Sequence, residues 1–154
     1  PLLKKNNLNN VIKENISLIS KLDKNIKIKL INHLSKEVLI SFDLEQMNRL
    51  FFNLIKNSLE SIQEKSKKDS KIDKNIDIEI RQRRDYININ IIDTGVGFKN
   101  KTTKELIKPY FTTKEKGTGL GLSIVDKIIS DHNGSIQFLN HKKGAKIQII
   151  LPNK

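Results

Sequence analysis

The sequence predicts an α/β sandwich, in which helices cover one face of a mixed β-sheet. Two observations predict this fold class: several short segments alternate apolar and polar residues, and longer segments repeat apolar residues at three- and four-residue steps. The chain has 154 residues, of which 36% are hydrophobic and 30% are charged. Because this length and composition suit one globular domain with a two-layer core, we expect residues 1–154 to form a single domain.

The first half of the chain predicts a short helix, two strands and a long helix. Apolar residues from Leu8 to Ile19 have helical spacing, and residues 26–30 and 38–42 have strand-like patterns. Asp43 is a suitable N-cap for the long helix, because its carboxylate can accept a backbone N–H of the first turn. The stripe that this helix should bury consists of Leu44, Met47, Phe51, Leu54, Ser58 and Ile62.

The second half predicts four more strands and one more helix. Isoleucines alternate with polar residues over 76–81 and 86–93, which predicts two strands. A helix is expected over 120–132, followed by strands over 135–140 and 145–151 that glycine turns delimit. The polar positions that should form the other face of the sheet include Asp77, Glu79, Asn88 and Asn90.

Composition limits the class of protein. No apolar run approaches the ~18 residues of a membrane-spanning helix, and the absence of cysteine excludes disulfides and thiolate metal sites and fits a reducing cytoplasm. The net charge of +12 invites nucleic-acid binding, but the lysines are mixed with acidic residues, so we expect no nucleic-acid partner. Because the chain begins at Pro1, we expect it to be an excised piece of a longer protein.

Asp93 is the first residue that indicates a ligand. Strand alternation directs its carboxylate to the same inner side as Ile91, where an acid without a partner is costly. Gly95 and Gly97 follow it and permit a tight backbone turn. A carboxylate accepts hydrogen bonds and the exocyclic amine of adenine donates them, so an acid on a pocket floor selects adenine over guanine. The plainer alternative is an ordinary turn at a strand end.

Asn53 and Asn57 lie four residues apart on the long helix and therefore share one face beside the apolar stripe. Amide oxygens are neutral, hard ligands that suit Mg²⁺ while it stays bound to phosphates and water. Lys56 is one position away and can reach phosphate oxygens. The alternative is that both asparagines are simply exposed in a chain rich in asparagine.

A glycine-rich stretch opens the helix expected over 120–132, and the segment before it, 98–116, has little periodicity and predicts a mobile loop. Glycines let the backbone approach an anion, and a helix N-terminus directs N–H groups and a positive dipole end toward it. Neither a Walker A loop nor a Rossmann fingerprint fits this stretch. A flexible helix cap is the alternative. The residues concerned are Thr113, Lys114, Gly117, Thr118, Gly119, Leu120, Gly121 and Leu122.

Taken in order, these motifs resemble the catalytic ATP-binding domain of sensor histidine kinases. The resemblance includes the asparagine helix, Asp-x-Gly-x-Gly from Asp93, Pro-Tyr-Phe-Thr-Thr-Lys at 109–114 and Gly-Thr-Gly-Leu-Gly-Leu at 117–122. Asp-His-Asn-Gly-Ser-Ile at 131–136 also matches, so the resemblance covers about 8–152. Within the family, the sequence is most similar to the nitrogen-regulation class.

The resemblance implies the Bergerat ATP-binding fold, a two-layer α/β sandwich that binds ATP with Mg²⁺. By similarity, Asn57 would ligate Mg²⁺ with Asn53 nearby, and Asp93 would bind the adenine amine. Gly95 and Gly97 would shape the adenine pocket. The remaining site would consist of the ATP lid, 98–116, with Lys114 near the phosphates, and of the loop 117–122 around the triphosphate.

The chain departs from the pattern of the family in two places, one of which is Tyr110-Phe111, where the family usually has paired phenylalanines before Thr-Thr-Lys. Many members carry a basic residue three positions after the second asparagine and an aromatic residue after that, whereas this chain has Glu60 and Ser61. Phosphate contact from this helix would therefore fall to Lys56.

The resemblance also implies the reaction, which is transfer of the γ-phosphoryl group of ATP to a histidine. The acceptor histidine of the family is followed by an acidic residue, which is true of none of His33, His132 and His141. We therefore expect these three to be surface or structural residues, and the acceptor to lie on a dimerisation domain of the same parent protein. A downstream response regulator and a cytoplasmic location, on a parent that can be anchored in the inner membrane, are implied likewise.

Three alternatives stay open at this point. ATP-driven clamps of the gyrase, mismatch-repair or chaperone type share the fold, but they place a glutamate four residues before the metal-binding asparagine, where this chain has Asn53. An anti-sigma serine kinase is harder to exclude, although Thr-Thr-Lys at 112–114 leans away from it. A scaffold with a degenerate nucleotide site would lack saturable, Mg²⁺-dependent ATP binding.

Overall fold

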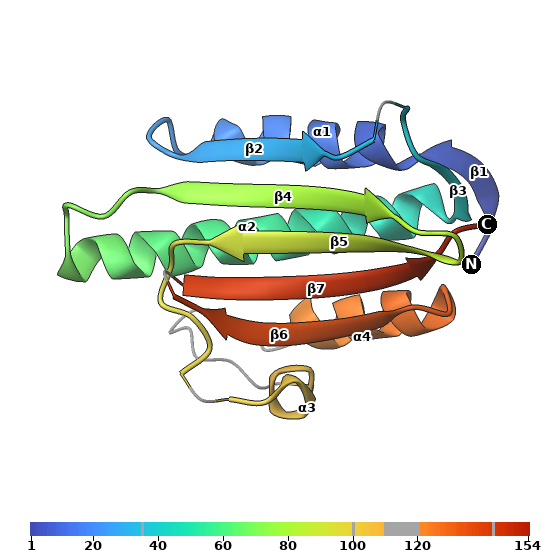
Figure 1. Cartoon of the computed structure of the whole chain (residues 1–154). Helices are drawn as coiled ribbons and strands as arrows, with labels where there is room; N and C mark the ends of the chain where they lie inside the picture. Colours follow the sequence, from blue (N-terminus) through green and yellow to red (C-terminus); the bar gives the residue numbers. More distant parts are fainter. Residues whose placement is uncertain (35, 100, 110–120, 143) are drawn as a thin grey trace.

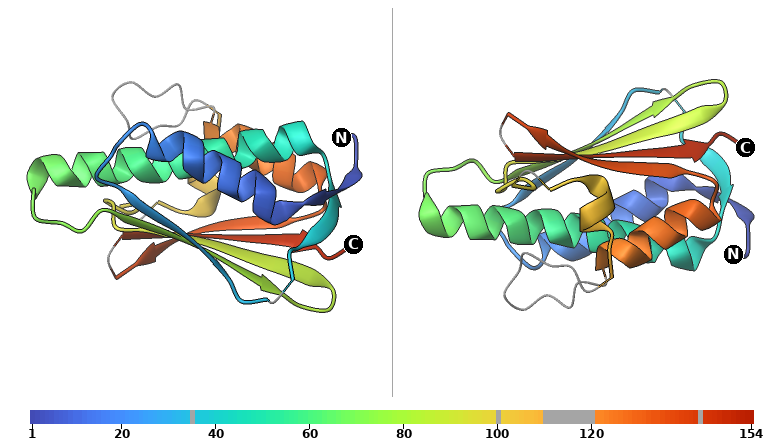
Figure 2. Two further views of the ribbon diagram at one scale, coloured as in Figure 1. Left: turned by 90° about the horizontal axis from the view of Figure 1, so that it is seen from above. Right: turned by 90° about the horizontal axis from the view of Figure 1, so that it is seen from below.

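Helices cover one face of a five-stranded sheet and leave the other face open in the computed structural model (Figures 1 and 2). The model describes residues 1–34, 36–99, 101–109, 121–142 and 144–154. The mixed sheet under helices that the sequence predicts is therefore confirmed. The elements are β1 (Lys4–Asn7), α1 (Leu8–Ser20), β2 (Lys27–Asn32), β3 (Leu39–Phe42), α2 (Leu44–Lys68), β4 (Asn75–Gln82), β5 (Tyr86–Asp93), α3 (Thr103–Leu106), α4 (Gly121–Asp131), β6 (Ser135–His141) and β7 (Gly144–Pro152).

The large sheet has the strand order β2-β4-β5-β7-β6. Strand β2 runs parallel to β4, and all other neighbours are antiparallel. In this register Ile78 lies opposite Ile91, and Ile91 lies opposite Ile147, so isoleucines form buried rows across the sheet. Period-two alternation places all of these side chains under the helices, as the sequence predicts.

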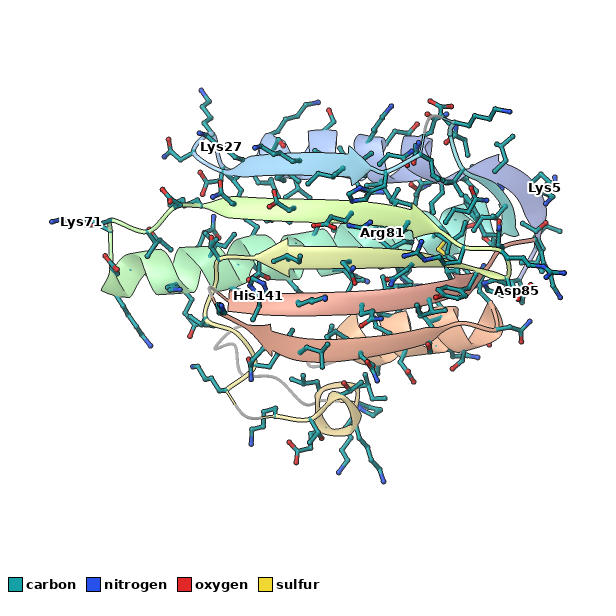
Figure 3. All side chains as sticks on the ribbon, in the orientation of Figure 1. Lys5, Lys27, Lys71, Arg81, Asp85 and His141 are labelled. Atoms are coloured by element: carbon teal, nitrogen blue, oxygen red, sulfur yellow. The ribbon has the colours of Figure 1, made fainter. Side chains whose placement is uncertain are left out.

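The open face of the sheet carries the polar residues that alternate with those isoleucines (Figure 3). Glu79 forms an ion pair there with Arg81, with Nη2 and Oε2 3.7 Å apart, and its Oε2 lies 3.4 Å from Nε2 of His33. The expected polar positions are half-buried on this face, namely Asp77, Glu79, Asn88 and Asn90.

Helix α2 buries the predicted stripe with one exception. Met47, Phe51 and Leu54 are fully buried, but Leu44, at the first position of the helix, is 47% exposed. Asp43 caps the helix as expected, since its Oδ1 accepts the N–H of Gln46 at 3.1 Å. Although α2 has 25 residues, neither it nor another described helix is both long and apolar enough to cross a bilayer.

Strand β1 is absent from the sequence-based prediction, because Lys-Lys-Asn-Asn has no apolar alternation. It pairs with β3 in a two-stranded antiparallel sheet, with Lys4 opposite Phe42. Strand β3 also donates the Ser41 N–H to the carbonyl of Lys154 at 2.7 Å. Both ends of the chain therefore lie beside β3, at the same end of the molecule (Figure 1).

A one-turn helix, α3, lies within the segment for which the sequence predicts a loop. Thr102 and Glu105 form a capping box, in which each side chain accepts the other's backbone N–H at 3.2 Å. The Phe138 N–H of β6 donates to Thr103 Oγ1 at 2.9 Å, and Leu106 is buried. This part of the segment is therefore structured and attached to β6.

Candidate functional site

Asp93 ends β5 with its side chain on the inner face of the sheet, where the residue is 3% exposed. Its Oδ1 accepts two backbone N–H groups, from Gly95 at 2.9 Å and from Ala145 at 3.3 Å. Desolvation raises the pKa of Asp93, although these hydrogen bonds act in the opposite direction. A desolvated carboxylate with a raised pKa is typical of a binding or catalytic site.

Ser58 on α2 is a site residue that sequence reasoning misses, because it is read there as part of the apolar stripe. Its hydroxyl faces the Asp93 carboxylate and favours the ionised form. The hydroxyl is buried and makes no hydrogen bond of regular geometry with the described residues. The acid and a buried hydroxyl with unused hydrogen-bonding capacity therefore lie together.

Ser61, one turn further along α2, holds the glycine turn against the helix. Its Oγ accepts the N–H of Val96 at 2.9 Å. A Cβ on Gly95 would overlap that same oxygen and lie 2.7 Å from the Ser61 Cβ. A small residue at each of these two positions allows the close approach.

The second half of the turn is attached to β6. Gly97 has a φ of +75°, which few residues other than glycine adopt. Asn140 Oδ1 accepts the N–H of Phe98 at 2.9 Å, and the Phe98 ring meets Phe138 edge-on with centroids 5.4 Å apart. The start of the expected lid is therefore fixed against the sheet.

Gly144 on β7 precedes Ala145, which is the residue that pairs with Asp93. A Cβ there would lie 2.7 Å from the backbone nitrogen of Gly95 and closer still to the carbonyl oxygen of Asp93. Glycine at this position lets β7 approach the turn, and the next residue, Ala145, then donates its N–H to Asp93. The sequence offers no local signal for this contact, because it depends on the pairing of β5 with β7.

The amide face of α2 lies next to these residues. Asn57 precedes Ser58, Asn53 is one turn earlier, and both asparagines are half-buried. Lys56 is exposed, with its Nζ 5.7 Å from the centroid of the Phe52 ring. The structure thus brings the asparagine helix and the acid of β5 together on one side of the sheet.

Helix α4 is described over Gly121–Asp131, and its predicted first residue, 120, lies outside the described part of the chain. No described atom lies within 4 Å of a Cβ built on Gly121, and Leu122 is half-buried. The other expected phosphate-binding residues lie outside the described part of the chain, namely Thr113, Lys114, Gly117, Thr118, Gly119 and Leu120.

Comparison with known proteins gives a family match over most of the chain. The family described as histidine kinase-, DNA gyrase B-, and HSP90-like ATPase matches residues 42–154. Sporulation kinase A of Bacillus subtilis is 35% identical over 118 residues, which are 76% of this chain and 18% of that protein. The nitrogen regulation protein NtrY of Azorhizobium caulinodans is 36% identical over 112 residues, which are 71% of this chain and 14% of that protein. The chain thus spans less than a fifth of these two relatives.

A solved structure agrees with this match. The catalytic domain of histidine kinase ThkA superposes with a TM-score of 0.83 at 25% identity, over 98% of this chain and 95% of that domain. ThkA has also been solved in complex with the response regulator protein TrrA. The fold, the buried acid beside the asparagine helix, and the match over 42–154 lead to one conclusion: this chain belongs to the family of histidine kinase-, DNA gyrase B- and HSP90-like ATPases.

Proposed function

We propose that the chain is the catalytic, ATP-binding domain of a two-component sensor histidine kinase. It binds ATP with Mg²⁺ and donates the γ-phosphoryl group to a histidine on a dimerisation domain outside this chain. The single observation that carries the proposal is the burial of Asp93 beside the amide face of α2. Two of the proteins named above, sporulation kinase A and histidine kinase ThkA, are kinases by name and support the same reaction.

Asp93 would bind the exocyclic amine of adenine. Among the described residues, the backbone donors to this carboxylate are those of Gly95 and Ala145, and both reach Oδ1. Oδ2 therefore has no described backbone donor and can accept an N–H from the base. Because the carboxylate is already desolvated, a hydrogen bond from the ligand to it contributes more binding free energy than the same bond at the surface.

The phosphates and Mg²⁺ would lie along α2 and the start of α4. Asn57 would ligate the metal with Asn53 nearby, and half-buried amides a turn apart fit an ion that keeps water and phosphate ligands. When bound, Mg²⁺ neutralises charge on the β- and γ-phosphates. Lys56 would contact phosphate oxygens, the loop 117–122 would wrap the triphosphate, and 98–116 would form the lid with Thr113 and Lys114 near the phosphates.

The partners follow from the same reaction. The phosphoacceptor domain would belong to the same parent protein, and a response regulator would receive the phosphoryl group, as the complex of ThkA with TrrA suggests by analogy. The site would work in the cytoplasm, on a parent that can be anchored in the inner membrane.

Two measurements test the proposal. Titration with a fluorescent ATP analogue should show saturable, Mg²⁺-dependent binding that ATP displaces and GTP does not. Incubation of the longer parent chain with labelled ATP should then modify a histidine on its dimerisation domain. Absence of saturable binding would favour a scaffold, hydrolysis without transfer would favour an ATP-driven clamp, and a phosphoserine product would favour a serine kinase.

A further inference from the structure

Three segments meet at Asp43, at the end of the molecule that holds both chain ends (Figure 1). Its Oδ1 accepts the N–H of Gln46 at 3.1 Å, which caps α2. Its Oδ2 accepts the N–H of Leu2 at 2.8 Å, and its own N–H donates to His132 Nε2 at 3.0 Å. The bonds from Leu2 and Gln46, in that order, lower the pKa of Asp43. One residue thus joins the first residues of the chain, the start of α2 and the residue that follows α4.

His132 is 6% exposed and is a structural residue, as the sequence predicts for it. Because Nε2 accepts the N–H of Asp43, the imidazole proton must lie on Nδ1, which donates to the carbonyl of Ile128 at 2.7 Å. That carbonyl lies in the last turn of α4 and also accepts the backbone N–H of His132 at 3.1 Å. The neutral ring therefore links the end of α4 to the start of α2, and we call this Asp43–His132 contact the α2–α4 clamp.

The clamp fixes the position of α4 along the axis of α2. Helices α2 and α4 pack against each other (Figure 2), and the clamp joins the beginning of one to the end of the other, so they run in opposite directions. At about 1.5 Å per residue, Asn53 is about 15 Å from Asp43 along α2, and Gly121 is about 16 Å from His132 along α4. Because these two distances are similar, the first turn of α4 is held beside the asparagine face of α2.

We propose that Asp43 and His132 are positioning residues for the nucleotide site, although neither touches it. This inference rests on the proposed function, in which phosphates bind between the amide face of α2 and the first turn of α4. Sliding of one helix along the other would separate these two groups of ligands, and binding groups must be held to about 0.5 Å to act together. The clamp opposes that sliding at the far end of both helices.

The test compares two replacements of His132 that differ in reach. His132→Asn can still donate to the Ile128 carbonyl but is too short to reach the N–H of Asp43. His132→Gln places an amide oxygen where Nε2 lies, so it can keep the clamp. His33→Asn, at an exposed histidine paired with Glu79, is the control for the substitution itself.

The Kd of Mg-ATP should be measured by calorimetry on the 154-residue chain, at a temperature where circular dichroism shows every variant to be folded. We expect His132→Asn to raise the Kd about fivefold, the equivalent of one hydrogen bond. The Kd of Mg-ATP for His132→Gln and for His33→Asn should stay within about twofold of the wild-type value. A lower Tm with an unchanged Kd for His132→Asn would overturn the inference, and so would equal losses for His132→Asn and His132→Gln.

A second readout does not depend on nucleotide. Amide exchange at Val125 and Asp126, in the second turn of α4, should be faster in His132→Asn than in the wild type, and restored in His132→Gln. Equal exchange in all three proteins would contradict the clamp. If His132→Asn is poorly folded, trimethylamine N-oxide restores the compact state, and the same comparison is made there. A wild type that fails to bind Mg-ATP would overturn the proposed function instead, while the exchange data would still report on the clamp.

Discussion

The environment of Asp93 reduces the stability of the fold, and on the proposed function it favours binding of the ligand. Its carboxylate is removed from water, and two backbone N–H groups on one oxygen do not fully compensate, because its pKa remains raised. A carboxyl group whose folded-state pKa exceeds its unfolded value binds protons more tightly in the folded state. It therefore destabilises the fold increasingly as pH rises through the folded-state pKa, and its effect disappears in acid.

Asp93→Asn should separate these two effects. The amide oxygen can still accept the N–H groups of Gly95 and Ala145, and the buried charge is gone. We expect the ligand-free variant to be at least as stable as the wild type at pH 7, with a difference that shrinks as pH falls. ATP affinity should fall about 10- to 100-fold, because an amide N–H would face the adenine amine. Urea unfolding at several pH values checks the effect on stability, and titrations with ATP and with GTP check the effect on affinity. An unchanged preference for ATP over GTP would contradict the role of Asp93.

Gly144 is expected to tolerate substitution far less well than Gly121. A Cβ on Gly144 meets the backbone of Asp93 and Gly95, which cannot move without opening the pairing of β5 with β7. Gly144→Ala should therefore cost about 2–3 kcal/mol of unfolding free energy. Gly121→Ala meets no described atom and should be neutral or stabilising by about 1 kcal/mol, since alanine favours a helix. Similar unfolding free energies for the two variants would show that the close approach at Gly144 is unimportant.

At the scale of elements, α2 packs into the core with one face and would contribute to the proposed site with another. Asn57 lies beside the buried stripe and is itself half-buried. Asn57→Ala should thus leave the Tm within a few degrees of the wild type while it raises the Kd of Mg-ATP at least about tenfold. The loss of ATP affinity should be smaller when Mg²⁺ is omitted, because the proposed role of Asn57 is metal ligation. Equal losses with and without Mg²⁺ would argue against that role.

Helix α3 should depend on its contact with β6. Thr103→Val removes the oxygen that accepts the Phe138 N–H and leaves the capping box of Thr102 and Glu105 in place. We expect faster amide exchange over 101–109, with a change in global unfolding free energy of about 1 kcal/mol or less. Thr102→Ala, which removes the cap instead, provides the comparison. Unchanged exchange in Thr103→Val would mean that other contacts hold this segment.

Elements with a strong apolar period could be predicted from the sequence, and the others could not. The spacing of the isoleucines in β4 and β5, and of the apolar stripe in α2, predicts which side chains are buried. The bounds of these three elements can therefore be predicted within a few residues. Strand β1 has no such period and forms because β3 offers it backbone partners. Helix α3 is signalled only by the capping pair Thr102 and Glu105, which periodicity does not detect.

For the whole molecule, the sequence indicated the ingredients of the candidate site but not how they are joined. The placement of Asp93 could be predicted because strand alternation is a local rule. The contacts of Ser61 with Gly95, of Gly144 with Asp93 and of His132 with Asp43 connect distant segments. They depend on strand pairing and helix packing, which a single sequence does not specify residue by residue.

The net charge of +12 is also a property of the whole molecule. Lysines project from its two ends, as Lys5 and Lys71 show in Figure 3. Repulsion among them destabilises the compact state, and salt screens it. The Tm of the ligand-free chain should therefore rise by roughly a few degrees between 20 mM and 300 mM sodium chloride. A Tm that is constant or falls over this range would show that local ion pairs outweigh the net repulsion.

The desolvated carboxylate of Asp93 also affects how fast the domain is degraded in a cell. On the proposed function, a molecule without nucleotide carries this unrelieved charge and opens more readily than one with nucleotide bound. Because a ligand of the native state adds stability with the logarithm of its concentration, the energy supply of the cell would set the rate of proteolytic turnover. Starved cells would then lose this domain faster than growing ones.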